Sequence, residues 1–292
     1  MMDYLTLLTA VLLLAFDFAI NKVYQKKVGA DAPSVLRFNA INGLFTAVIF
    51  FGINGVSNGF RFEISLYSLL MATAMAVFGL SYNFIGFRML RDGNMASYTL
   101  FLMTGGMAVP YIWGLFALGE PFSYVRTLGL IVIFTGVFCA NTPKARPSAK
   151  YILMGVSVFA LNGLVSTVSK MHQVEDAFRT VSSASFVMLS GLSKAVCCML
   201  VLALMNRKQA GRAEGGKPMV GLIAVSALLG GVSYLLQLIG AKSLPATVLY
   251  PIITGGSIIF SALAGRVFFR EKILPATLAG IALCFIGTCM FL

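Results

Sequence analysis

The chain contains ten successive apolar runs of about 20 residues each, joined by short polar connections. In order, the runs cover residues 4–22, 33–53, 65–87, 95–118, 122–141, 150–170, 180–205, 219–241, 245–268 and 273–292. A helix needs about 20 apolar residues to cross the hydrocarbon core of a bilayer. Charged residues make up only 11% of the chain, against about 25% in soluble domains. The sequence therefore predicts an all-α membrane protein with ten transmembrane helices.

Similarity within the chain divides the ten runs into two units. Glu120, Gly129, Phe134 and Gly136 return 151 positions later as Glu271, Gly280, Phe285 and Gly287, and Thr104-Gly105-Gly106 returns 150 positions later as Thr254-Gly255-Gly256. We therefore expect one five-helix repeat over residues 1–143 and a second over residues 144–292. Because five is odd, the second repeat enters the membrane from the opposite side. Secondary transporters often use such inverted repeats around a site near the midplane.

The positive charges predict the orientation of the chain. Its net charge of +12 would suggest nucleic acid in a soluble protein, but here the basic residues lie mostly between apolar runs. Fifteen lie in connections on one side and five on the other, while Arg37 and Lys194 lie within runs. The positive-inside rule places the fifteen in the cytoplasm and both termini outside. The first run follows Asp3 and no basic residue, which favours a retained helix over a cleaved signal peptide.

The sequence lacks the patterns typical of enzyme sites. It has no nucleotide-binding loop, no cluster of metal ligands and no pair of nucleophile and base. All five cysteines lie inside apolar runs, which indicates packing rather than disulfides or metal binding. The lone His172 falls between the sixth and seventh runs, where we expect it to be solvated. We expect no catalysis, metal or cofactor.

Two carboxylates and two glycine pairs have structural interpretations. Glu120 and Glu271 each precede a predicted helix, where a carboxylate stabilises the helix N-terminus by about 0.3–1 kcal/mol. Gly129 and Gly136 lie two turns apart on one helix face, as Gly280 and Gly287 do in the second unit. Small residues with this spacing allow helices to approach closely in lipid. We expect packing here, within the protein or between protomers.

Interruptions within helices recur in both units. The doublets Gly105-Gly106 and Gly255-Gly256 lie in the middle of predicted helices, with Pro110 and Pro251 nearby. Proline removes a backbone hydrogen bond, and glycine weakens a helix by about 1 kcal/mol relative to alanine. Broken helices in both halves indicate a transport site, so these six residues are hinge or gate candidates. Close helix packing is the alternative interpretation.

Three charged residues lie inside apolar runs. A charge at a helix centre costs about 2.5–3.5 kcal/mol on insertion scales, so such residues usually face a cavity or a partner. Arg37 is near enough to the cytoplasmic end to reach it. Asp17 can pair with Arg37 or face a cavity. Lys194 lies in the middle of its run, which predicts that it faces the central cavity and binds solute or protons.

The charges within the runs are not repeated between the units, whereas the scaffold is. The position in the second unit that corresponds to Asp17 is occupied by the uncharged Asn162, and no charged residue corresponds to Lys194 in the first unit. An asymmetric pair of charges suits an asymmetric solute such as an amino acid. Amide and phenol side chains in apolar walls are typical of ligand cavities, although they also make interhelical hydrogen bonds. With Lys194 and Asp17, the substrate-binding candidates are Asn42, Tyr82, Asn83, Tyr98, Tyr111, Trp113, Asn162, Tyr234, Gln237 and Tyr250.

Several segments together carry a family resemblance. Pro33-Ser34-Val35-Leu36-Arg37-Phe38 is similar to the start of the second helix of EamA-like members of the drug/metabolite transporter superfamily. The segment from Asp17 to Lys22 resembles the end of their first helix, with Asp in place of Asn. Leu118-Gly119-Glu120, followed by Gly129 and Gly136, resembles their Leu-Gly-Glu signature, and Arg270-Glu271 is a weaker second copy. The resemblance covers nearly the whole chain.

The resemblance implies a ten-helix solute carrier whose substrates are amino acids, other small metabolites or drugs. We expect a multi-pass protein of the inner membrane that exports amino acids or similar metabolites by alternating access. A gradient, with protons as candidate coupling ions, would supply the energy, and the protein would be a monomer or homodimer in the lipid bilayer. The alternatives are a transporter of cationic drugs or quaternary amines centred on Asp17, and a flippase for lipid-linked intermediates.

Overall fold

The computed structural model describes residues 2–29, 31–59, 63–92, 95–140, 148–205, 219–270 and 275–291. The expected boundary between the two units, at residues 143 and 144, lies outside these ranges, as does Glu271. The described residues form ten helices and no strand, which confirms the predicted all-α class.

The helices follow the ten apolar runs, and several extend beyond them. They are α1 (Met2–Val28), α2 (Ala32–Asn58), α3 (Leu66–Asp92), α4 (Met95–Phe116), α5 (Tyr124–Ala140), α6 (Ala149–Val174), α7 (Ser183–Leu204), α9 (Val220–Ser243), α10 (Ala246–Phe269) and α11 (Pro275–Cys289). Three N-termini carry side-chain caps: Asp31, Ser148 and Ser182 each accept a hydrogen bond from the backbone N–H three residues later. Such caps satisfy amide groups that a helix leaves unpaired at its start.

Eight of these helices are long and apolar enough to span a membrane. The other two, α5 and α11, have 17 and 15 residues. At about 1.5 Å per residue they are shorter than the hydrocarbon core, which is about 30 Å thick. Large apolar side chains such as Val48, Leu153 and Ile286 are more than half exposed on the outside of the bundle. A lipid environment accounts for that exposure.

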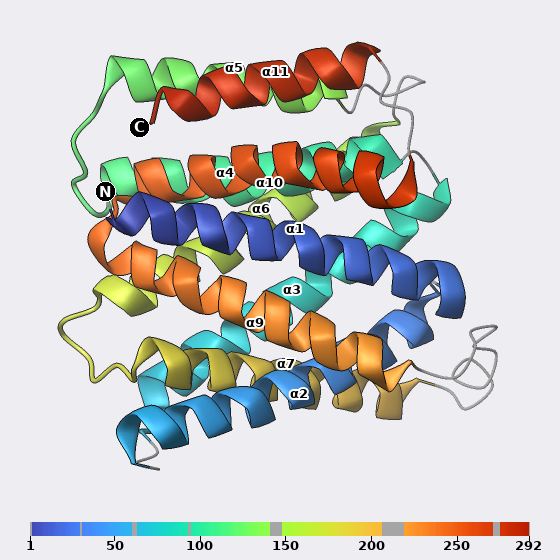
Figure 1. Cartoon of the computed structure of the whole chain (residues 1–292), viewed down its shortest axis with the longest axis vertical. Helices are drawn as coiled ribbons and strands as arrows, with labels where there is room; N and C mark the ends of the chain where they lie inside the picture. Colours follow the sequence, from blue (N-terminus) through green and yellow to red (C-terminus); the bar gives the residue numbers. More distant parts are fainter. Residues whose placement is uncertain are drawn as a thin grey trace.

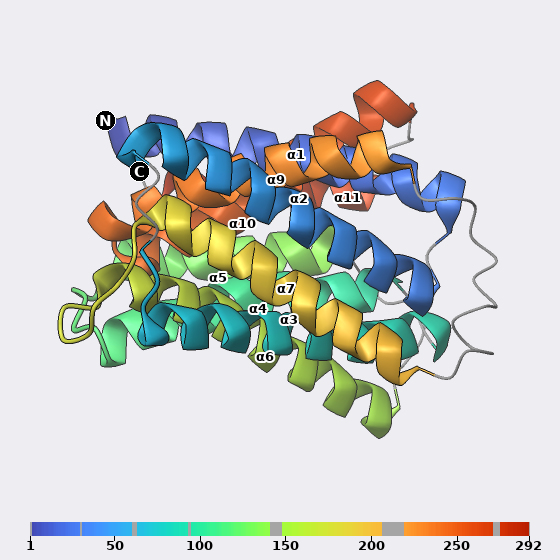
Figure 2. The same cartoon turned by 90° about the horizontal axis from the view of Figure 1, so that it is seen from below.

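The helices run along one shared direction, and both chain ends lie at the same end of the bundle (Figure 1). Helices α5 and α11 pack against each other at one edge of the bundle, and α2 and α7 do so at the other (Figure 1). Figure 2 shows the bundle from the edge formed by α2 and α7. Three helices of the first five pack against their counterparts in the second five, as α2 with α7, α4 with α10 and α5 with α11. In each half the first helix packs against the third helix of the other half, as α1 does with α9 and α6 with α3.

Glycines set the closest of these crossings. A Cβ added to Gly136 would lie 2.7 Å from the carbonyl oxygen of Gly280, and one added to Gly129 would lie 2.9 Å from that of Gly287. Contacts this short exclude any larger side chain, so the two glycine pairs hold α5 against α11 within one chain. The α2–α7 crossing uses Gly43, whose added Cβ would lie 2.5 Å from the carbonyl oxygen of Gly191.

Candidate functional site

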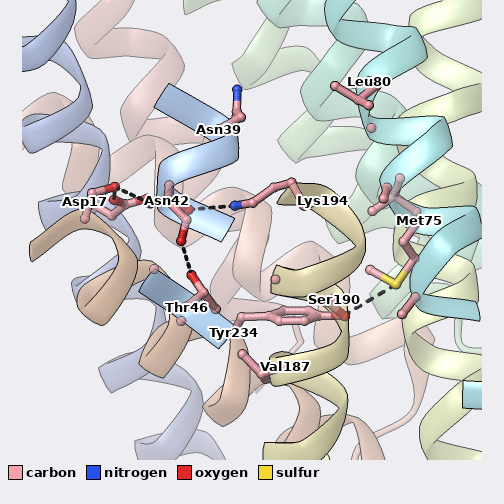
Figure 3. Close-up of a pocket in the computed structure, with 18 of the residues that line it drawn as sticks. Asp17, Asn39, Asn42, Thr46, Met75, Leu80, Val187, Ser190, Lys194 and Tyr234 are labelled. Atoms are coloured by element: carbon pink, nitrogen blue, oxygen red, sulfur yellow. Dashed lines mark hydrogen bonds between the residues drawn. The ribbon is translucent and has the colours of Figure 1, made fainter. Parts of the chain in front are cut away.

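A cavity of about 420 Å³ lies in the bundle among α1, α2, α3, α6, α7 and α9. Its polar lining residues are Asp17, Asn39, Asn42, Thr46, Tyr82, Asn83, Ser190, Lys194, Ser226 and Tyr234. The rest of the lining is apolar or glycine: Leu14, Ala72, Met75, Ala76, Gly79, Leu80, Val165, Val187, Gly191, Gly230 and Gly231. Both predicted charged residues of the site, Asp17 and Lys194, therefore reach one cavity (Figure 3).

Asp17 and Lys194 are joined by a chain of hydrogen bonds through two neutral side chains. Lys194 Nζ donates to Asn42 Oδ1 at 2.6 Å, and Asn42 Nδ2 donates to Ser226 Oγ at 3.2 Å. Ser226 Oγ in turn donates to Asp17 Oδ1 at 2.5 Å. Asn21 Nδ2 donates to the other carboxylate oxygen at 3.2 Å. Every bond in the chain is directed from the ammonium toward the carboxylate, so the two ends polarise the same path.

Close packing between helices brings these four side chains together. The crossing of Gly43 and Gly191 holds α2 against α7, and it places Asn42 beside Lys194 near the middle of α7. On α9, a Cβ at Gly230 would lie 3.1 Å from Asp17 Oδ2, so the glycine leaves room for the carboxylate. Ser226 lies four residues earlier, on the same face of α9.

The cavity is bounded on one side by Tyr234, which lies beneath Lys194 in Figure 3. Its hydroxyl lies 3.0 Å from Ser169 Oγ on α6 and 3.6 Å from Met75 Sδ on α3. The phenol ring therefore presents its apolar body to the cavity while its polar end is bonded to the walls.

Half of the predicted substrate-binding residues line this cavity and half do not. Those that line it are Lys194, Asp17, Asn42, Tyr82, Asn83 and Tyr234. Those that the structure places elsewhere are Tyr98, Tyr111, Trp113, Asn162, Gln237 and Tyr250. Asn162 donates to the carbonyl of Leu102 at 2.7 Å, and the Tyr250 hydroxyl donates to the carbonyl of Ser166. Both residues thus make the interhelical hydrogen bonds that were the alternative interpretation.

The other residues outside the cavity also have local partners. The Tyr111 hydroxyl lies 2.9 Å from Thr127 Oγ1, and Gln237 donates to Ser233 within α9 at 3.1 Å. The ring of Tyr98 covers Gly86, and Trp113 is 39% exposed on the outside of the bundle.

The glycines among the hinge candidates lie at tight helix contacts. Gly105 packs against the backbone of Phe159 on α6, and Gly106 against the amide of Asn162. Gly256 lies against Val11 on α1, where an added Cβ would be 2.9 Å away, and Gly255 lies against Thr288. Pro110 and Pro251 lie inside α4 and α10, as predicted. The geometry accounts for the glycines by packing, and a hinge role for these six residues stays a prediction.

His172 is not solvated, and that prediction was wrong. The sixth helix continues to Val174, so His172 lies in its last turn with only 1% of its surface exposed. Its ring stacks on Phe186 with centroids 3.6 Å apart, and Nε2 lies 2.8 Å from Ser68 Oγ. The apolar run ended four residues before the helix does, because the last turn is polar yet buried by α3 and α7.

Lys170 is one of the five basic residues that the loop-charge count places on the less positive side, and it is likewise buried. It is 4% exposed, and Nζ donates to the carbonyls of Ala241 at 2.6 Å and Leu244 at 2.7 Å. These carbonyls end α9, where the helix dipole is negative and favours a cation. Lys170 therefore does not count toward the loop charges of its side.

Glu120 caps a helix, but not the one that follows it in the chain. Its two carboxylate oxygens accept from the backbone N–H groups of Ala246 at 2.5 Å and Thr247 at 2.8 Å. These groups begin α10, so a residue before α5 stabilises a helix of the second half of the chain. The predicted chemistry holds, and only the partner helix differs.

Sequence reasoning missed Ser226, Thr46 and Gly79 as lining residues. Serine and threonine occur throughout apolar helices, where they usually bond to their own backbone, as Thr46 does to the carbonyl of Asn42 at 2.8 Å. Only the pairing of α9 with α1 distinguishes Ser226 from such residues. No local pattern in the sequence could have selected it.

Comparison with known proteins agrees with this architecture. Residues 149–292 match the model of the EamA-like transporter family. No curated protein matches the chain in sequence. A solved structure titled "Crystal structure of protein" is similar over 99% of this chain and 95% of its own, with a TM-score of 0.77 and 18% identity. At that identity the likeness shows the fold alone. The family match confirms the resemblance drawn from the sequence: residues 149–292, the second half of the chain, are those of an EamA-like transporter of the drug/metabolite transporter superfamily.

Proposed function

We propose that the protein transports amino acids or similar small zwitterions, and that Lys194 and Asp17 bind the two charged ends of the solute. The observation that carries this proposal is the presence of both charges on one cavity with Asn42 and Ser226 between them. A solute carboxylate can replace the Asn42 oxygen as the partner of Lys194. A solute ammonium can replace the Ser226 hydroxyl as the partner of Asp17. Neither charge then lacks a partner at any stage.

The cavity volume supports a small solute. At about 420 Å³ it falls near the lower end of the range of about 300–1,000 Å³ that is usual for small-molecule sites. The transport cycle we propose is alternating access in the inner membrane, with export as the direction and protons as the coupling ions. The pairing of α2 with α7, α4 with α10 and α5 with α11 supports two inverted repeats, over residues 1–143 and 144–292. The protein would act as a monomer or homodimer.

Matched ligands test which charges the solute needs. The purified full-length protein would be heated with leucine, with 4-methylpentanoate, which lacks the ammonium, and with 3-methylbutylamine, which lacks the carboxylate. Leucine should raise the midpoint of thermal unfolding, and each analogue should bind at least about tenfold more weakly, because one buried charge keeps no solute partner. A preference for the amine alone would instead support a transporter of cations centred on Asp17. Equal shifts of the unfolding midpoint by all three ligands would contradict both the zwitterion and the cation hypotheses.

A further inference from the structure

The cavity has its charged residues on one side and a largely apolar wall on the other. In Figure 3, Asp17 and Asn42 lie on one side of Lys194, and Met75 and Leu80 on α3 lie opposite them. The α3 wall includes Ala72, Met75, Ala76 and Gly79, whose spacing of three and four residues places them on one helix face, and Tyr82 and Asn83 continue that face as its polar end. This half of the cavity offers a solute dispersion contacts and no charge.

Gly79 differs from most other glycines of the bundle. Added Cβ atoms at Gly43, Gly191 and Gly230 would lie within about 3.1 Å of a neighbouring helix. At Gly79 the nearest atom is Tyr82 Cε1, at 3.9 Å. Packing against another helix therefore does not require a glycine there. The space beside it belongs to the cavity, and a Cβ at position 79 would enter that space without displacing protein atoms.

We propose that the solute carries an apolar side chain of leucine or phenylalanine size, which lies along α3, and that Gly79 determines the largest size accepted. This inference rests on the proposed function, because the charged end of the solute has to lie between Lys194 and Asp17. With the charged end held there, the stretch of the α3 wall from Ala72 to Leu80 is an apolar surface that remains for the rest of the solute. Ala72 and Ala76 leave this wall shallow along the same face, and Met75 is flexible enough to follow solutes of different shape.

A series of amino acids of increasing side-chain size tests the proposal. Glycine, alanine, leucine and phenylalanine would be titrated against the purified full-length protein, with thermal unfolding as the readout. Leucine and phenylalanine should bind at least about tenfold more tightly than glycine, because their side chains leave water for the α3 wall. Gly79→Val should weaken the binding of leucine and phenylalanine by about tenfold or more, and it should change the affinity for glycine and alanine by less than about twofold. Gly79→Ala should cause a smaller loss of affinity, again larger for leucine and phenylalanine than for glycine and alanine.

Gly52→Val is the matched control. Gly52 is exposed on α2, no atom lies within 4 Å of an added Cβ, and it does not line the cavity. Its substitution should leave the affinities for all four amino acids unchanged. Binding without a preference for size, or an equal loss of all four ligands in Gly79→Val, would overturn the inference and leave the proposed function standing. If no amino acid stabilised the wild-type protein, the proposed function itself would be contradicted.

Discussion

The ammonium nitrogen of Lys194 lies 2.6 Å from the amide oxygen of Asn42. A cation in the middle of a membrane helix costs about 2.5–3.5 kcal/mol, and a hydrogen bond to a charged group returns about 1.5–3 kcal/mol. Asn42 therefore offsets most of the cost of burying the charge without neutralising it. A carboxylate partner would bind the ammonium more strongly and would compete with the solute for it. The neutral amide keeps the cation available.

Asn42→Asp should weaken zwitterion binding by about tenfold or more, because Lys194 would then have a permanent carboxylate partner. Binding of leucine to the purified protein would measure this. Asn39→Asp is the control, since Asn39 also lines the cavity from α2 but donates to the carbonyl of Val35. Equal affinity of Asn42→Asp and the wild type would show that Lys194 is not the carboxylate site.

Lys170→Met should destabilise the protein by about 1.5–3 kcal/mol, because the two carbonyls that end α9 would lose a charged donor. Lys242→Met removes a positive charge from the same end of α9, at an exposed position, and should cost less than about 0.5 kcal/mol. Thermal unfolding in detergent compares the two variants. The same midpoint for both would contradict a capping role for Lys170.

Glu120→Ala should lower stability by about 0.5–2 kcal/mol, the usual cost of losing an N-terminal cap. Glu120→Gln keeps one oxygen that can accept from Ala246 or Thr247, so its loss should be smaller. Glu63→Ala, at an exposed carboxylate before α3, provides the baseline. If the alanine and glutamine variants at position 120 both matched that baseline, the cap would be of no consequence for stability.

The sequence could predict the helices because a span requires an apolar run, and each of the ten runs became a helix. It could predict Lys194 and Asp17 because charges inside such runs are costly and few. It could not separate Asn42 from Asn162, because an amide that lines a cavity and an amide that bonds to a neighbouring backbone look alike in one dimension. The burial of His172 was missed for a related reason, since α3 and α7 supply the surroundings that its own segment lacks.

The orientation predicted from the loop charges can be tested at the two ends of α6. In a protein without its native cysteines, Lys150→Cys places a single thiol at an exposed position in the first turn of α6, and Asp176→Cys places one at an exposed position just after its last residue. A membrane-impermeant thiol reagent should label Asp176→Cys in intact cells, and it should label Lys150→Cys only after the cells are broken. The reverse pattern would overturn the positive-inside assignment.

Lys194→Met tests the central claim most directly, because methionine keeps the length and apolar bulk of lysine while removing its charge and its donors. Reconstituted into liposomes, the variant should be folded and monodisperse, with its thermal unfolding midpoint near that of the wild type. It should nevertheless lose at least about 95% of the exchange of labelled leucine, because the solute carboxylate would have no partner in the cavity. Wild-type exchange by a folded Lys194→Met protein would contradict the account.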